Sequence, residues 1–154
     1  MIFIALGSNL GNREEYLAQA RTALMLHDVD IVAQSAVIET PALLPEGAPA
    51  EWNVPYLNQV VRVETQLDPR ELLTCLKLIE GDLGRKDRPH WAPREIDLDL
   101  LCYGDEIVVT DHLTVPHPQM DTRAFVLRPL VEIAPHWRHP VLGKTAAELL
   151  AELG

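Results

Sequence analysis

The sequence has few cysteines, few aromatic residues and no long apolar run, and each shortage narrows what the chain can be. Its two cysteines, Cys75 and Cys102, lie in separate apolar stretches and form no C-x-x-C pair. We therefore expect buried free thiols in a reducing compartment. No stretch approaches the ~18 consecutive apolar residues that a membrane span requires, and the start lacks the basic region of a signal peptide. We expect a cytoplasmic protein with no membrane partner.

Positive charge is scarce as well. The chain has 13 lysines and arginines against 23 aspartates and glutamates, for a formal net charge of −10. Such a surface repels phosphate backbones, so we expect no nucleic-acid partner. A phosphate-bearing ligand then needs a metal or a local basic cluster. One such cluster stands between residues 85 and 94: Arg85, Lys86, Arg88 and Arg94.

Familiar nucleotide and metal motifs are also missing. The chain contains neither G-x-x-x-x-G-K-[ST] nor G-x-G-x-x-G, which argues against a P-loop and against a Rossmann dinucleotide site. His112 and His117 are not accompanied by cysteines or by a helical H-E-x-x-H, so a zinc site is not supported. For His117, a contact to a phosphate is the better hypothesis.

What the sequence does contain is a regular succession of strand and helix patterns within 154 residues, the size of one domain. At 47% hydrophobic residues the chain can bury a core unaided. Asn12 and Asp68 are typical helix caps, and Gly84 is a typical helix stop. From apolar periodicity we predict strands over residues 1–6, 31–39, 56–65, 95–103 and 107–109, and helices over 12–27, 68–84, 122–133 and 144–153.

The predicted order is βαββαβ followed by a hairpin and C-terminal helices. This is the order of an α+β, ferredoxin-like sandwich with helices on one face of the sheet. The proline-rich segment 40–55 is predicted to be a long irregular loop, a kind of segment that is often functional. Pro129 should kink its helix or mark the true start of it. No repeat or linker interrupts the chain, so we predict a single domain over residues 1–154.

The sharpest chemical feature is the segment REIDLDL at residues 94–100. Strand side chains alternate between two faces, so Asp97 and Asp99 share one face at a separation of roughly 7 Å. Two like charges so placed repel each other and favour a bound cation. Carboxylates suit Mg²⁺, and two of them can bridge a pair of such ions around a polyphosphate. A solvent-exposed strand face is the alternative. The residues expected to enter the core from the other face are Ile96, Leu98, Leu100 and Cys102.

Arg85 and Arg94 bracket a proline-containing loop directly before the acidic pair. Arginine presents paired donors to phosphate oxygens, and phosphoryl-type transfer depends on such charge stabilisation. We predict that this loop closes over a polyphosphate; a solvated charged turn is the alternative. Tyr56 and Asn58 share a strand face, and an aromatic ring beside an amide can hold a flat polar heterocycle. Simple packing is the alternative for these side chains.

These pieces occur together in one known family. The sequence resembles the 6-hydroxymethyl-7,8-dihydropterin pyrophosphokinases, enzymes of folate biosynthesis, through motifs in the same order along nearly the whole chain. The matching motifs are ALGSNLGN, ETPAL, PYLNQVV, IEGDLGR, HWAPREIDLDLL, LTVPHPQM and RAFVLRPLVEIAP. The segment W-x-P-R-x-x-D-x-D followed by L-T-V-P-H is far more specific than a lone D-x-D.

The resemblance implies a ferredoxin-like fold, two Mg²⁺ ions, ATP as co-substrate and a pterin whose hydroxymethyl oxygen attacks the β-phosphorus of ATP, releasing AMP. Asp97 and Asp99 match the metal ligands of the family. Arg85 and Arg94 match the mobile-loop arginines that assist transfer. The positions implied to contact ATP are Glu80, Lys77, His112, His117 and Arg123. The positions implied to form the pterin pocket are Thr40, Pro41, Tyr56, Asn58, Trp91 and Phe125.

The chain departs from some family members at Lys77, His112 and Pro118, which bears on the contacts to ATP and not on the reaction. Two other functions stay open on the residues alone. A D-x-D glycosyl- or nucleotidyltransferase shares the metal motif but usually needs a larger nucleotide-binding domain than 154 residues provide. A ferredoxin-like ligand-binding module needs the strands and no turnover. We expect a monomer that acts on small molecules.

Overall fold

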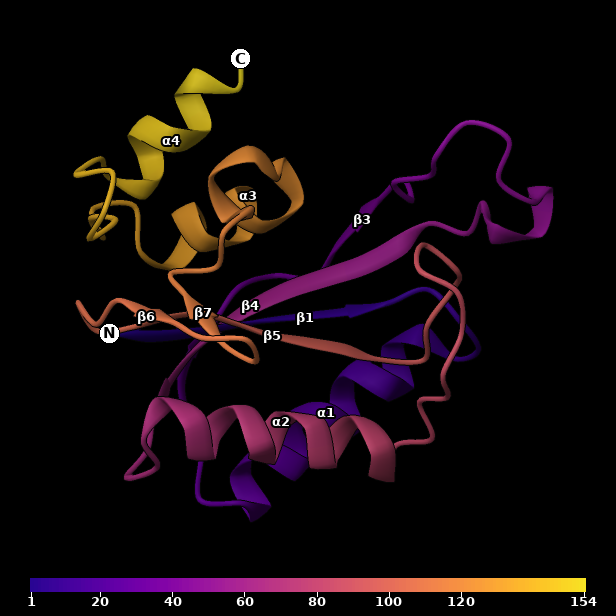
Figure 1. Cartoon of the computed structure of the whole chain (residues 1–154), viewed down its shortest axis with the longest axis horizontal. Helices are drawn as coiled ribbons and strands as arrows, with labels where there is room; N and C mark the ends of the chain where they lie inside the picture. Colours follow the sequence, from indigo (N-terminus) through magenta and orange to yellow (C-terminus); the bar gives the residue numbers. More distant parts are fainter.

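One antiparallel sheet organises the computed structural model, which describes all 154 residues (Figure 1). Its strands lie in the order β2-β4-β1-β5, and the short β3 pairs with β4 beyond the end of β2. The central β1 is therefore hydrogen-bonded to β4 on one side and to β5 on the other. The strands are β1 (Ile2–Ser8), β2 (Asp30–Gln34), β3 (Ile38–Thr40), β4 (Tyr56–Glu64) and β5 (Asp97–Tyr103).

Helices cover both faces of this sheet (Figure 1). The crossovers from β1 to β2 and from β4 to β5 place α1 and α2 on one face, and α3 and α4 lie on the other. This arrangement confirms the predicted ferredoxin-like fold, and it shows that the C-terminal helices form a second layer where we expected helices on one face only. The helices are α1 (Arg13–Leu26), α2 (Pro69–Asp82), α3 (Ala124–Ile133) and α4 (Ala146–Glu152).

The two layers give the sheet two apolar cores. Ile4 and Leu6 of β1 pack into the larger core under α1 and α2, whereas Phe3 packs into the smaller core under α3 and α4, with its ring edge-on to Trp137. A strand buried on both faces reads as a continuous apolar run, which is why residues 1–6 lack alternation. The predicted extra hairpin is present as β6 (Val108–Val109) paired with β7 (Thr114–Val115).

The strand predicted over residues 31–39 is in fact two strands, β2 and β3, separated at Ser35. The Ser35 hydroxyl accepts a hydrogen bond from the Val60 amide at 3.0 Å, a bond that a regular ladder would give to a carbonyl. The Ser35 carbonyl accepts from the Gln59 side-chain amide at 2.8 Å. Local side-chain hydrogen bonds of this kind compete with strand pairing. The pairing with β4 is therefore interrupted at Ser35 and resumes at Ile38.

The last strand also differs from its prediction. It begins at Asp97 rather than at residue 95, and its pairing with β1 shifts between Leu100 and Cys102, so that Leu101 is an extra, bulged residue. A bulge reverses the facing of every later side chain. Cys102 therefore lies in the core under α3 and α4, not beside Leu98 and Leu100 as alternation predicted.

Helix ends follow their caps closely. The Asn12 side chain accepts from the Glu15 amide, as predicted, and Gly84, with φ of 94°, follows the end of α2. The C-terminal helices begin two residues later than expected, at Ala124 and Ala146, and Pro129 lies inside α3 rather than at its start. Residues 40–55 contain one 3₁₀ turn, Ala50–Trp52, within the predicted loop. None of the helices has the length and apolar character to cross a membrane.

The cap of α2 gives a direct stability test. Asp68 accepts from the Glu71 amide at 2.8 Å while the Glu71 side chain accepts from the Asp68 amide at 3.0 Å. We expect Asp68→Ala to lower the free energy of unfolding by about 1 kcal/mol in urea denaturation, because the Glu71 amide loses its acceptor. Asp82→Ala is the matched control at the other end of the helix, where an acid opposes the helix dipole and its loss should be neutral or stabilising. Equal losses in both variants would contradict the assignment.

Candidate active site

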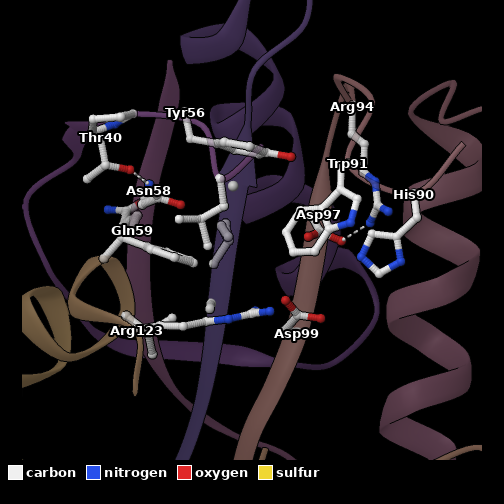
Figure 2. Close-up of a pocket in the computed structure, with 17 residues that line it drawn as sticks. Thr40, Tyr56, Asn58, Gln59, His90, Trp91, Arg94, Asp97, Asp99 and Arg123 are labelled. Atoms are coloured by element: carbon white, nitrogen blue, oxygen red, sulfur yellow. Dashed lines mark hydrogen bonds and ion pairs between the residues drawn. The ribbon is translucent and has the colours of Figure 1, made fainter. Parts of the chain in front are cut away.

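A pocket opens on the α3 side of the sheet, at the end of β1 where the chain leaves towards α1 (Figure 2). The empty space in it is about 810 Å³, which includes open solvent at its mouth. Strands β1, β4 and β5 supply its floor. The end of β3 with the segment after it, the loop of residues 85–96 (the basic loop) and the start of α3 supply its walls. The lining residues are Ala5, Leu6, Gly7, Thr40, Pro41, Leu43, Tyr56, Asn58, Gln59, His90, Trp91, Arg94, Asp97, Asp99, Arg123, Phe125 and Val126.

The floor of the pocket is made by small residues on β1. Gly7 is paired with Asn58 on β4 and with Asp97 on β5, so these three residues form one row across the sheet. Ala5 is paired with Asp99 in the next row. A Cβ on Gly7 would meet the Asn58 Oδ1 at 3.2 Å and the Tyr56 ring at 3.5 Å. The absence of a side chain at this position therefore leaves the space above the row free.

One wall carries polar and aromatic groups suited to a flat ring. The Asn58 side-chain amide donates to the Thr40 hydroxyl at 2.6 Å, and both side chains are buried. This bond orients the Asn58 amide and leaves its oxygen at the floor of the pocket. Burial raises the pKa of the Tyr56 hydroxyl, and the nearby Asp97 charge adds to the shift, so Tyr56 is a neutral, donating group at physiological pH.

Aromatic groups from the basic loop and from the start of α3 complete this half of the pocket. Trp91 is 40% exposed and lies against the His90 ring, with centroids 4.5 Å apart. Its backbone has a φ of 75°, in the left-handed region that a bulky residue seldom adopts. Strained residues gather at ligand sites, and this one turns an indole over the pocket (Figure 2). On the α3 side, the Arg123 guanidinium lies 5.6 Å from the centre of the Phe125 ring.

The acidic pair lies on the pocket face of β5, and its two members have different partners (Figure 2). Asp97 accepts from Arg85 Nη1 at 3.2 Å and lies 3.5 Å from Arg94 Nη1. Asp99 has no such ion pair. Burial, and then the charges of Asp97 and Glu80, raise the pKa of the Asp99 carboxyl to about 7. Asp99 is thus a carboxylate whose charge the protein alone does not balance.

A short chain of charges lies behind the acidic pair. Glu80 of α2 is buried, and its Oε2 accepts from Arg85 Nη1 at 2.6 Å and from the Leu98 amide at 2.8 Å. Burial raises the pKa of the Glu80 carboxyl, while the Leu98 amide and Arg85 oppose that shift. Glu80 therefore fixes Arg85 between helix and strand. In the same loop, Arg88 forms a two-point ion pair with the buried Glu95.

The donor set at this place fits magnesium better than a transition metal. No group of three or more histidine, cysteine, aspartate or glutamate side chains is gathered as a protein-only cage. Mg²⁺ usually takes one or two carboxylates and completes its octahedron with waters and substrate phosphates. The uncompensated charge of Asp99 beside Asp97 is what a divalent cation would neutralise. The two side chains therefore fit the predicted ion.

Some of the predicted site residues line the pocket and others do not. The six residues predicted for the pterin all line it, as do Arg94 and Arg123. His117 does not line it, and its Nδ1 accepts from the Gln119 amide; burial and Arg123 lower the pKa of its imidazole. Lys77 is exposed on α2, and His112 is exposed between β6 and β7. Neither borders the pocket as it stands.

Several lining residues were not predicted as site residues. Leu43 lies in the proline-rich loop, 49% exposed, and no periodicity marks it. His90 was not predicted either, although an aromatic residue next to Trp91 is a usable signal for a stacked pair. Gly7 is the second-last residue of β1, and the sequence does not show which side chains approach it.

Comparisons with known proteins agree with this geometry. The family model described as 7,8-dihydro-6-hydroxymethylpterin-pyrophosphokinase (HPPK) matches residues 3–135. A 2-amino-4-hydroxy-6-hydroxymethyldihydropteridine pyrophosphokinase of Aquifex aeolicus is 40% identical, over 98% of this chain and 91% of its own. The corresponding Bacillus subtilis protein is 45% identical, over 85% of this chain and 76% of its own.

Other similar proteins are longer than this chain. The folate synthesis bifunctional protein of Chlamydia trachomatis is 43% identical over 97% of this chain, which spans only 35% of that relative. The solved HPPK-DHPS structure of Plasmodium falciparum with pteroate superimposes with a TM-score of 0.72 at 16% identity, covering 98% of this chain and 42% of the other; at that identity the likeness concerns the fold. With a family match over most of its length and a relative 40% identical over nearly all of it, this chain belongs to the 7,8-dihydro-6-hydroxymethylpterin-pyrophosphokinase family.

Proposed function

We propose that this chain transfers the pyrophosphoryl group of ATP to 6-hydroxymethyl-7,8-dihydropterin in folate biosynthesis. The observation that carries the proposal is the union, in one pocket, of a wall for a flat polar ring and a pair of carboxylates flanked by arginines. The hydroxymethyl oxygen forms a bond to the β-phosphorus of ATP while the bond from that phosphorus to the α-phosphate oxygen breaks. AMP leaves, and the hydroxyl proton passes to solvent or a bound base.

The pterin half of the pocket matches that substrate in chemistry. The Asn58 oxygen at the floor can accept from the ring's N–H edge, since its amide is already committed to Thr40. Tyr56, Trp91 and Phe125 bring aromatic surface to the ring faces. Pro41 adds an apolar rim at the mouth. We assign Thr40, Pro41, Tyr56, Asn58, Trp91 and Phe125 to pterin binding.

The other half of the pocket has the groups that a bound polyphosphate requires: carboxylates that can hold metal ions, and arginines. We assign Asp97 and Asp99 as ligands of two Mg²⁺ ions, which when bound would neutralise the polyphosphate and polarise its oxygens. Arg94 and Arg85, both at Asp97 in this structure, are in reach of phosphate oxygens placed beside it and stabilise charge on the transferred group. Glu80, Lys77, His112, His117 and Arg123 are assigned to ATP; for Lys77 and His112 this requires the nucleotide to extend beyond the pocket lining.

The setting of this activity is part of the proposal. We treat residues 1–154 as a single pyrophosphokinase domain that acts as a monomer in the cytoplasm on two small molecules. The formal net charge of −10 supports the absence of a nucleic-acid partner.

The reaction is tested by identifying the nucleotide product. The protein, ATP, Mg²⁺ and 6-hydroxymethyl-7,8-dihydropterin should give AMP and the pterin diphosphate, measured by chromatography and phosphorus NMR. Asp97→Ala should abolish nearly all turnover, because the Mg²⁺ ions would lose a carboxylate ligand. The circular dichroism spectrum should stay native. Formation of ADP, or full turnover in the variant, would overturn the proposal.

The floor of the pocket predicts a substrate-specific defect. A methyl group at Gly7→Ala would stand 3.2 Å from the Asn58 oxygen, so it should displace that acceptor and raise the KM for the pterin about tenfold or more. The KM for ATP should stay within about twofold of the original. Gly81→Ala is the control, since a Cβ there meets nothing within 4 Å, and helix propensity favours alanine. Equal rises in both KM values would contradict the assignment of Asn58.

The charge on Asp99 predicts a pH-dependent stability difference in protein kept free of divalent ions with EDTA. The pKa of this carboxyl is raised to about 7 in the folded protein, so ionising it opposes folding, and stability is lost as pH rises from about 4 to about 7. Asp99→Asn should therefore be more stable than the original above pH 7, by up to ~4 kcal/mol, and equal to it below pH 4. Thermal melts at each pH measure this. The exposed Asp105→Asn serves as control, and a difference that does not vary with pH would contradict the burial argument.

A further inference from the structure

Asn9 is a fully buried polar side chain directly after β1, and it does not line the pocket. Burying an amide is unfavourable unless its donor and acceptor are both used. Here both are used, and both bonds reach segments that lie far away in the sequence. The Asn9 side-chain oxygen accepts from the Arg94 amide at 2.8 Å, and its side-chain nitrogen donates to the Val54 carbonyl at 3.0 Å.

The contact to Arg94 has a second component. The backbone amide of Asn9 donates to the Arg94 carbonyl at 3.1 Å, so Asn9 engages both the amide and the carbonyl of Arg94. The pair closes a ring of two hydrogen bonds, as neighbouring residues in a sheet do, although neither residue is in a strand. A residue held at both backbone groups has its Cα, and hence the origin of its side chain, fixed relative to β1.

Arg94 lies three residues before Asp97, near the end of the basic loop. Arg94 lines the pocket, and its Nη1 lies 3.5 Å from Asp97. The basic loop has no regular structure from residue 85 to residue 96. Movement of that loop would carry the Arg94 guanidinium with it unless its last turn were anchored. Asn9 is the anchor that the contacts show.

The hydrogen bond from the Asn9 side-chain nitrogen to the Val54 carbonyl reaches the segment before β4, on the other side of the pocket. Val54 lies two residues before Tyr56, the first residue of β4. The neighbouring Pro55 carbonyl accepts from Arg13 Nη1 at 2.9 Å, so the approach to Tyr56 has other support. Arg94, by contrast, has its backbone held by Asn9 alone among the side chains that contact it. The dominant effect of Asn9 should therefore be on Arg94.

We propose that Asn9 is a positioning residue for the pyrophosphoryl transfer: by clamping the backbone of Arg94 it sets the guanidinium against Asp97 and the β-phosphate. This inference rests on the proposed function. It assigns to the residue that follows β1 a task in the chemical step, carried out through Arg94 and without contact to either substrate. Small displacements of a charged group that stabilises a transition state lower the rate far more than they lower binding.

A double-mutant cycle on kcat tests the proposal. Asn9→Ala should lower kcat by about tenfold to a hundredfold, with the KM for ATP changed by less than about threefold. In an Arg94→Ala background the same change should lower kcat further by less than about threefold, because the side chain it positions is already gone. Asn12→Ala is the matched control, since it removes a hydrogen-bonding asparagine of the same turn and should leave kcat unchanged.

Two further measurements separate this role from a structural one. The Arg94 amide should exchange faster with solvent in Asn9→Ala, while core amides of β1 keep their protection. Asn9→Asp, which retains an oxygen opposite the Arg94 amide, should recover part of the lost kcat, and it replaces Asn9→Ala in the cycle if the alanine variant does not fold. Equal losses of kcat in the two backgrounds, or an Arg94 amide that stays protected, would overturn the proposal. If the original protein makes no AMP, the proposed function falls, and the exchange experiment still decides whether Asn9 clamps Arg94.

Discussion

The pairing of β1 with β4 on one side and β5 on the other is the constraint on which the site depends. It places Asn58, Gly7 and Asp97 in one row, so the ring-binding wall and the acidic pair stand two strand spacings apart, roughly 10 Å. That separation suits a hydroxymethyl group attached to a bound ring on one side and a polyphosphate on the other. A slip of one residue in the pairing of β5 with β1 would turn the acids towards α1 and α2. The apolar residues Ile4 and Leu6 on that face resist such a slip, because burying a carboxylate among them is far more costly than leaving it at the pocket.

The charged groups around the site are mostly neutralised by ion pairs with nearby side chains. The surface is acidic, yet the arginines of the basic loop are paired with buried or half-buried carboxylates: Arg85 with Glu80 and Asp97, and Arg88 with Glu95. Only Asp99 is left without a cationic partner among the acids of the site. Within the site every acid except Asp99 thus has an arginine partner, and Asp99 lies where a metal ion would bind.

Much of the fold followed from the sequence because its signals are local. The caps Asn12 and Asp68 and the stop at Gly84 require only neighbouring residues, and alternation along β4 and the first half of β5 is a period-two pattern. The site residues predicted on those strands therefore reached one pocket. The errors lie where a distant partner decides. Ser35 breaks a strand because Val60 donates to its hydroxyl, and the bulge at Leu101 exists only in the register with β1. Leu43 joins the site through a loop path that no periodicity encodes.

The helices on the second face of the sheet are needed to form the pocket. The strands and two helices of residues 1–103 complete the ferredoxin-like topology, and on their own they leave one side of the sheet open. Arg123, Phe125 and Val126, which border the pocket, all belong to the layer added afterwards. The cavity is therefore formed by two parts of the chain: a sheet that supplies its floor, and C-terminal helices that cover that face and enclose it. Without α3 and α4 the sheet would expose Phe3, Val60 and Leu101, and it would have no chamber in which a substrate could be shielded from water.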